Sequence, residues 1–187
     1  MPNWTDNVLV VKGDRDEVRK FYDFNHTIDK DSGNLDFTLN NLIPVPEELL
    51  NVDINEASSY TDEDKARIVK YGFANWHEFC TNLWGTKWDV DGPISKFNED
   101  GTELTITFST AWDCIAPWIR EATRRYPKLR FEYKSCDPAA NWHYELCTEN
   151  GGVVRAVEGT FEDNMKQWED EGWCDYFESD EDLEDDN

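Results

Sequence analysis

Basic side chains are scarce in this chain. Its 187 residues include 18 lysines and arginines against 41 aspartates and glutamates, which gives a formal net charge of −23. A surface of that sign repels phosphate groups, so nucleic acid and anionic membranes are excluded as direct partners. A binding partner is therefore expected to present a basic protein surface.

Long hydrophobic runs are absent as well. No stretch approaches the roughly 18 apolar residues that a membrane-spanning helix needs. The opening residues, from Met1 to Asp6, lack the basic and apolar regions of a secretory signal peptide. We therefore expect a cytoplasmic protein.

The cysteines follow no metal-binding or disulfide pattern. The five cysteines are widely spaced and odd in number, which favours free, mostly buried thiols in a reducing compartment. Cys136, His143 and Cys147 have ligand chemistry, but none of them belongs to a C-x-x-C or H-x-x-x-H pair. We expect His143 to be an ordinary, half-exposed strand residue, and we predict neither a metal nor a cofactor.

Catalytic motifs are also missing. The chain has no glycine loop of the kind that cradles phosphate. Nucleophilic catalysis needs a cysteine or serine beside a base, and His77 and Cys80 lie three positions apart on a predicted helix. A buried cysteine beside a surface histidine is the commoner outcome of such spacing. We therefore predict a non-enzymatic protein, with an enzyme built on this pair as a minor alternative.

Aromatic side chains, by contrast, are abundant. They make up 14% of the residues and include nine tryptophans. Each aromatic side chain buries roughly 150–250 Å² when packed, so a few of them replace many aliphatic residues in a core. Because disordered chains of high net charge contain few aromatics, we expect most of this chain to be folded.

Apolar periodicity divides the chain into strands and helices. It predicts strands near residues 7–11, 35–42, 88–90, 103–109, 129–133, 142–147 and 153–157, and helices near 14–24, 61–71, 75–83, 113–126 and 161–171. Two successive β-α-β units are typical of the ferredoxin-like split β-α-β fold. We therefore predict an α+β sandwich in which an antiparallel sheet carries helices on one face. Residues 1–157 would form this domain, with a helical insertion at about 51–84, and residues 158–187 would form an acidic C-terminal helix and tail.

Several segments of the chain resemble the YubB-like ferredoxin-like proteins of plasmids and bacteriophages. The similar segments occur in the family's order and are Met1–Trp4, Leu42–Leu49, Asn75–Trp76, Trp84–Asp89 and Phe108–Trp112. The hexapeptide from Trp84 to Asp89 is the most specific of them. The resemblance implies a ferredoxin-like fold and a gene on a mobile genetic element, hence a protein that works inside a bacterial host cell. It implies no known catalytic role, and it does not reach the acidic end.

The hexapeptide has two interpretations. Its two tryptophans can flank a planar or cationic ligand, and Gly85 between them permits close approach of the backbone. Alternatively, the segment is a helix-to-strand corner in which Gly85 turns the chain and both indoles fill the core. The candidate ligand cleft consists of Trp84, Thr86, Lys87, Trp88 and Trp112.

The last 32 residues carry the strongest signal in the sequence. They include fourteen acidic side chains and one basic one, Lys166, so that −13 of the net charge falls on them. In a fully helical segment this would be one charge per roughly 3.7 Å, at ~1.5 Å of rise per residue, close to the ~3.4 Å spacing along one DNA strand. The alternative interpretation is an acidic tail that only increases solubility. The candidate partner-binding residues are Glu162, Asp163, Trp168, Glu169, Asp170, Glu171, Trp173, Asp175 and Tyr176.

Charge and resemblance together give two hypotheses about function. The first is a non-enzymatic accessory protein of a phage or plasmid that binds a basic, nucleic-acid-binding host protein, as a DNA-mimicking inhibitor of a bacterial defence system would. The second is a ferredoxin-like module that binds a small ligand or a peptide at the corner between Trp84 and Trp88.

Overall fold

A computed structural model describes residues 3–28, 33–52, 54 and 60–173 of the chain. Within these ranges no helix combines the length and the apolar character that crossing a bilayer requires. The elements are β1 (Trp4–Lys12), α1 (Arg15–Asn25), β2 (His26–Ile28), β3 (Leu35–Phe37), α2 (Glu47–Leu50), α3 (Asp62–Tyr71), α4 (Trp76–Leu83), β4 (Asp91–Phe97), β5 (Glu103–Ala111), α5 (Ala116–Arg125), β6 (Arg130–Asp137), β7 (Trp142–Glu149), β8 (Gly152–Gly159) and α6 (Phe161–Asp170).

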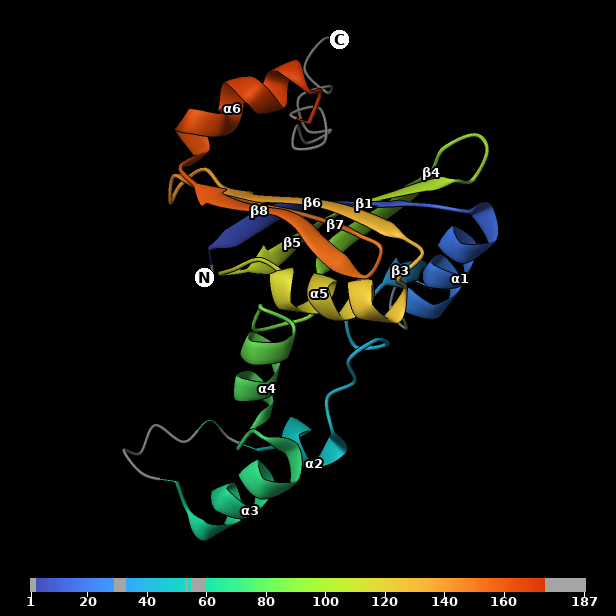
Figure 1. The fold of residues 1–187 in the computed structure, drawn as a ribbon. Coiled ribbons are helices and arrows are strands. Elements are labelled where there is room, and N and C mark those ends of the chain that lie inside the picture. The colour runs from blue at the N-terminus through green and yellow to red at the C-terminus, as the bar shows by residue number, and fades with distance from the viewer. Residues whose placement is uncertain (1–2, 29–32, 53, 55–59, 174–187) are drawn as a thin grey trace.

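The main sheet has six strands in the order β4-β5-β1-β6-β7-β8, and every neighbouring pair is antiparallel. β5 lies between β1 and β4, which are connected through α1 and the helices that follow it. β1 in turn lies between β5 and β6, which are connected through α5. Two interleaved β-α-β units of this kind define the ferredoxin-like fold, so the predicted α+β fold is confirmed. The hairpin of β7 and β8 extends the sheet beyond β6 (Figure 1).

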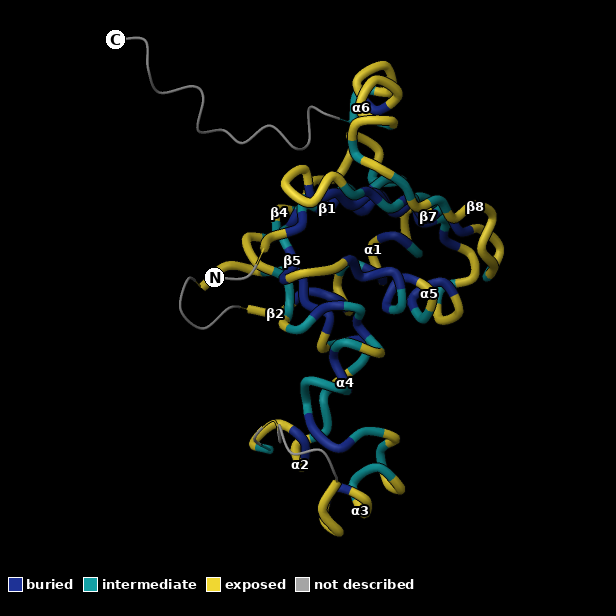
Figure 2. Tube along the Cα trace, turned by 90° about the vertical axis from the view of Figure 1, so that its left-hand side faces the viewer, coloured by how far each residue is buried: buried dark blue, intermediate teal, exposed yellow. Residues whose placement is uncertain are grey.

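Helices α1 and α5 cover one face of the sheet, and the core lies between these two layers (Figures 1 and 2). Phe21 of α1 and Trp118 of α5 are fully buried there, with their rings edge to face and the ring centroids 6.3 Å apart. The Trp118 indole also donates a hydrogen bond to the carbonyl of Leu39, at 3.0 Å. The sheet contributes its alternate, inward-pointing residues to this core, namely Leu9, Val11, Leu104, Ile106, Phe108, Phe131, Tyr133 and Leu146.

Helix α6 lies on the opposite face of the sheet from α1 and α5 (Figure 1). It is mostly exposed (Figure 2), but Trp168 in its last turns is completely buried. Helix α6 therefore follows the predicted boundary at residue 157 in sequence, but in space it packs on the sheet of the domain. Residues 174–187 of the predicted acidic tail lie outside the described residues.

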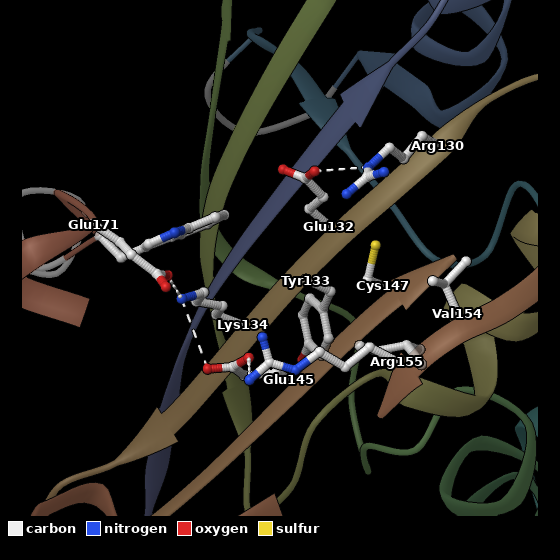
Figure 3. Close-up of a pocket in the computed structure, with 11 residues that line it drawn as sticks. Arg130, Glu132, Tyr133, Lys134, Glu145, Cys147, Val154, Arg155 and Glu171 are labelled. Carbon is white, nitrogen blue, oxygen red and sulfur yellow. Dashed lines mark hydrogen bonds and ion pairs between the residues drawn. The ribbon is translucent and has the colours of Figure 1, made fainter. Parts of the chain in front are cut away.

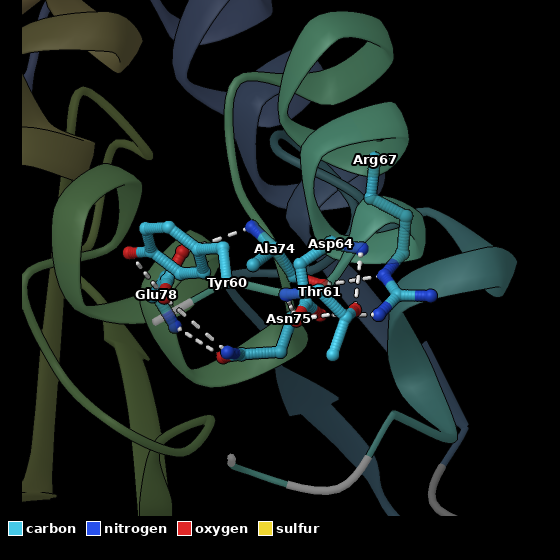
Figure 4. A network of polar contacts seen from close by, with 7 residues as sticks. All are labelled: Tyr60, Thr61, Asp64, Arg67, Ala74, Asn75 and Glu78. Atoms are coloured by element: carbon cyan, nitrogen blue, oxygen red, sulfur yellow. Dashed lines mark hydrogen bonds and ion pairs between the residues drawn. The ribbon is translucent and has the colours of Figure 1, made fainter. Parts of the chain in front are cut away.

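Helices α2, α3 and α4 form an arm that projects from the side of the domain carrying α5 (Figure 1). The arm corresponds to the predicted insertion. A polar network holds α3 against the start of α4 (Figure 4). Thr61 and Asp64 form a reciprocal capping box at the start of α3. Asp64 also pairs with Arg67 at 2.6 Å, and the Arg67 Nε donates to the carbonyl of Ala74 at 2.7 Å.

Two of the predicted strands have other bounds in the structure, and β2 was not predicted. The strand predicted at 88–90 begins only at Asp91, because the Val90 amide donates to the Asp89 carboxylate instead of to a neighbouring strand. The strand predicted at 35–42 ends at Phe37, because the Leu39 amide donates to the same carboxylate, as does the Thr38 hydroxyl. This contact ties the segment after β3 to the segment before β4.

Candidate functional site

Helix α6 carries most of the residues that the charge pattern selected for partner binding. Thr160 begins the helix, since its hydroxyl accepts a hydrogen bond from the Asp163 amide at 3.3 Å. The structure describes the candidate residues up to Trp173, whereas Asp175 and Tyr176 lie outside the described residues. The acidic segment is thus a defined helix from Phe161 to Asp170.

Trp168 attaches this helix to the sheet. Its side chain is 0% exposed, and its indole Nε1 donates a hydrogen bond to Glu145 Oε1 at 2.7 Å. The ring meets the imidazole of His143 edge to face at 5.5 Å and the ring of Phe161 at 6.3 Å. A buried indole with its N–H satisfied is a strong anchor, so the helix has a fixed position on the sheet.

Lys134 completes the attachment from β6. Its ammonium lies 2.7 Å from Glu171 Oε2 and 3.7 Å from Glu145 Oε1 (Figure 3). It also lies 5.0 Å from the ring centroid of Trp168 and 4.5 Å from that of Trp173, within the range of cation–π attraction. The hydrogen bond from Lys134 lowers the pKa of Glu171 below its ordinary value of 4.5. A buried ammonium therefore links the sheet to the end of α6.

The groups around Lys134 line a hollow of about 300 Å³ on the side of β6, β7 and β8 that carries α6. Glu145 is itself buried and also pairs with Arg155 of β8 at 3.2 Å. On the far side of the hollow Arg130 pairs with Glu132 at 2.7 Å (Figure 3). Each of these three cations has a carboxylate partner, so the hollow contains a network of ion pairs rather than an unpaired cation.

Four carboxylates of α6 lie away from the side of the helix that carries the buried Trp168, and we call them the acidic face: Glu162, Asp163, Glu169 and Asp170. All four are exposed. At about 100° per residue they lie roughly 100° or more around the helix from Trp168. Because Trp168 fixes the rotation of the helix, the acidic face has a fixed direction as well.

His143 is buried under α6, so its interpretation as a half-exposed strand residue was wrong. Its side chain is 0% exposed. Nδ1 lies 3.0 Å from the carbonyl oxygen of Thr160 and donates to it, while Nε2 makes no hydrogen bond with any residue that the structure describes. Gly159 permits this packing, since a Cβ there would lie 2.7 Å from His143 Cε1. The helix that covers His143 was not apparent from the alternation of β7.

The candidate metal ligands form no site in the described part of the chain. Cys136 and His143 are direct partners across β6 and β7, and Cys147 lies further along β7. Among the described residues, no group of three or more His, Cys, Asp and Glu side chains is placed to hold a metal ion.

Three of the described cysteines have raised pKa values. Burial raises the pKa of Cys80 and of Cys114 to about 12, and it raises the pKa of Cys147 as well. The nucleophile in cysteine catalysis is the thiolate, so these thiols are protonated near neutral pH. The pair of His77 and Cys80 gains no support as a catalytic site.

The segment from Trp84 to Asp89 divides its side chains between core and surface. Trp84 is only 5% exposed, and its indole donates to the carbonyl of Ile43 at 2.9 Å. Thr86 is buried and donates to the carbonyl of Ala111 at 3.0 Å. Trp88 is 41% exposed, and the ammonium of Lys87 lies 4.5 Å from its ring centroid. Because Trp84 is inside the core, Trp84 and Trp88 do not flank an open cleft.

Two of the five candidate cleft residues do meet at a surface hollow. Lys87 and Trp112 line it together with His77, Thr81, Gly85, Ala111 and Asp113. Trp112 is 64% exposed.

Gly85 allows close approach of the chain to itself rather than to a ligand. Its φ is +94°, and a Cβ at this position would lie 2.2 Å from the carbonyl oxygen of Cys114. We expect Gly85→Ala to lower the free energy of unfolding by about 2 kcal/mol, through backbone strain and overpacking. Urea denaturation measures the change. Gly92→Ala is the matched control, because Gly92 also has a positive φ, +56°, but no atom within 4 Å of its Cβ position; an equal loss in both variants would contradict the role of the close contact.

Comparisons with known proteins add little to this geometry. No family model matches the chain, and no curated protein matches it. A solved structure that matches is that of "a protein api92 from Yersinia pseudotuberculosis, family-model DUF1281", at 11% sequence identity and a TM-score of 0.48, covering 85% of this chain and 98% of that chain. A likeness at this level says nothing about function, so the functional argument rests on the residues of this chain.

Proposed function

We propose that this protein is a non-enzymatic binding protein whose partner is a basic, nucleic-acid-binding protein. The contact surface is the acidic face of α6, which would occupy the site that DNA otherwise occupies. The observation that carries the proposal is the complete burial of Trp168 beneath exposed carboxylates on the same helix. An inhibitor of a bacterial defence system that mimics DNA would act in this way.

A rigidly held acidic helix differs from an acidic tail in its binding properties. Charges fixed in space can match a fixed pattern of basic groups, which gives specificity as well as fast, salt-sensitive association. The acidic face comprises two pairs of adjacent carboxylates seven residues apart, or about 10 Å of helix rise. That distance corresponds to roughly three steps of ~3.4 Å along one DNA strand. The spacing supports mimicry of a short run of phosphates.

The proposed use of Trp84 and Trp88 as a ligand clamp has less support, since Trp84 lies in the core. The protein's net charge of −23 favours a cationic partner for any of its surfaces.

The proposal is tested by neutralising the acidic face. The variant carries Glu162→Gln, Asp163→Asn, Glu169→Gln and Asp170→Asn. Immobilised wild-type protein should retain nucleic-acid-binding proteins from a bacterial lysate at low salt, and added duplex DNA should displace them. The neutralised variant should retain at least roughly tenfold less of the same proteins, because it loses the fixed charges that they contact. Quantitative mass spectrometry of the retained proteins measures the difference.

A second variant controls for total charge. It carries the same number of neutralisations at exposed acids far from α6, namely Asp16→Asn, Asp23→Asn, Glu47→Gln and Glu63→Gln. This control should retain the partners nearly as well as the wild type. Equal losses in the two variants would indicate non-specific charge attraction, and retained proteins that DNA does not displace would contradict mimicry.

A further inference from the structure

Three tryptophans with exposed indoles lie at one end of the sheet, and we call this surface the tryptophan end. Trp4 begins β1, Trp88 precedes β4 and Trp112 follows β5; their exposed fractions are 43%, 41% and 64%. The strand register brings them to the same end, since Trp4 pairs with Ala111 and the Trp112 amide donates to the carbonyl of Asn3 at 3.0 Å. The other six tryptophans are buried or half-buried. Exposed indoles gathered in one place mark an interaction surface.

Trp112 combines an unfavourable backbone conformation with an exposed side chain. Its φ is +78°, a left-handed conformation that costs free energy for a bulky residue. Glycine would adopt this conformation without strain, and a polar residue would avoid exposing an indole to water. Both the backbone and the side chain are therefore unfavourable in the isolated protein. Strain of this kind concentrates at sites that hold a ligand.

A hollow of about 360 Å³ opens beside the Trp112 indole. Asp113 and Thr81 also line it; Asp113 is exposed, and one of its carboxylate oxygens accepts a hydrogen bond from the Cys114 amide at 2.7 Å. The volume is within the range of small binding pockets. An aromatic face and a carboxylate side by side recognise a planar cation by stacking and by paired hydrogen bonds.

The charge of the protein favours a cation as well. Asp113 is the carboxylate among the residues that line the hollow, and the net charge of the chain is −23. His77 and Lys87 are the basic side chains among the lining residues, and the ammonium of Lys87 lies 4.5 Å from the ring centroid of Trp88. Lys87 and Trp88 thus form a cation–π contact with each other, and the indole of Trp112 remains available to a cation of a ligand.

We propose that the hollow beside Trp112 is a binding site for an arginine side chain of a protein partner. The guanidinium stacks on the Trp112 indole and pairs with Asp113. A guanidinium is preferred to an ammonium because it is planar, weakly hydrated and able to donate two parallel hydrogen bonds. This site is separate from the acidic face of α6 and does not depend on it.

The test uses short peptides that differ at one position. A peptide with a single arginine is compared with otherwise identical peptides that carry lysine or citrulline, the neutral isostere of arginine. Titration is followed by the indole N–H signals of the tryptophans in NMR spectra of ¹⁵N-labelled full-length protein. The arginine peptide should shift the Trp112 signal to saturation, the lysine peptide should bind more weakly, and the citrulline peptide should bind roughly tenfold or more weakly. The signals of Trp168 and Trp173 should not respond.

Trp112→Gly separates a binding role from a structural one. The variant relieves the left-handed strain and removes the indole, so it should be as stable as the wild type or more stable, while arginine-peptide binding, read from the amide signals of Lys87 and Asp113, falls by roughly tenfold. Asp113→Asn should weaken binding by a similar factor. Val69→Ser, which removes an exposed apolar side chain of the arm, should have no effect on binding.

Several outcomes would overturn the proposal. Equal binding of the arginine and citrulline peptides would show that charge plays no part. A large loss of stability in Trp112→Gly would assign Trp112 to the fold. Concentration-dependent self-association that disappears in Trp112→Gly would identify the occupant as a second copy of this chain. None of these outcomes affects the proposed role of α6, because the neutralised variant of the acidic face leaves the hollow intact.

Discussion

Replacing Trp168 with alanine is expected to detach α6 from the sheet. The substitution removes a side chain that is 0% exposed and leaves a cavity between helix and sheet, at a cost of about 3–5 kcal/mol. It also removes the hydrogen bond to the buried Glu145. Once detached, a helix of 10 residues is too short to persist, since isolated helices below about 12–15 residues are marginal.

The detached state is measured by amide hydrogen exchange. Amides of α6 should lose their protection, whereas those of β1, β5 and β6 should remain protected, because the core between the sheet and α5 is untouched. Partner capture should fall as far as it does in the neutralised variant, although no charge has changed. Met165→Ala, on the same helix but 40% exposed, is the control and should alter neither quantity. Capture that survives the loss of protection would mean that the partner binds a mobile acidic segment.

Local patterns in the sequence were sufficient to predict the framework of the fold. The apolar alternation of β5 and the helical stripe of α5 are each repeated over several residues, and both elements formed as predicted. The helices predicted near 61–71 and 75–83 also begin where predicted, with Thr61 and Asn75 as their N-caps. Strand order followed from two β-α-β units. These features depend on neighbours in sequence, which is why one sequence was enough.

The site could not be predicted in the same way, because it depends on residues that are distant in sequence. Trp84 and Trp88 have the same chemistry, and only the position of the Ile43 carbonyl places the first in the core. Lys134 and Glu145 were missed entirely. Their alternation with apolar residues predicts a polar sheet face, but it carries no sign that α6 would cover that face and bury both charges.

Replacing Lys134 with alanine is expected to cause the second large loss of stability. Lys134→Ala removes a buried ammonium that contacts Glu171, Glu145 and the rings of two tryptophans. Glu145 would remain buried, with Arg155 as its surviving cation, and Arg155 is half-exposed. Breaking a buried ion pair from one side costs about 3–5 kcal/mol. We therefore expect a loss of that size in the free energy of unfolding, measured by urea denaturation, together with faster hydrogen exchange in α6.

Two further variants separate the charge of Lys134 from its packing. Lys134→Met keeps an unbranched aliphatic side chain between the indoles, so it should recover part of the stability that Lys134→Ala loses. It should not recover all of it, because Glu145 still loses Lys134 and keeps only Arg155. Combining Lys134→Met with Glu145→Gln removes both buried charges and keeps a side-chain oxygen to accept from Trp168, so the double variant should be more stable than Lys134→Met alone. If the double variant were instead less stable than Lys134→Met, the charge of Glu145 would stabilise the protein even without Lys134, through its contacts with Arg155 and Trp168.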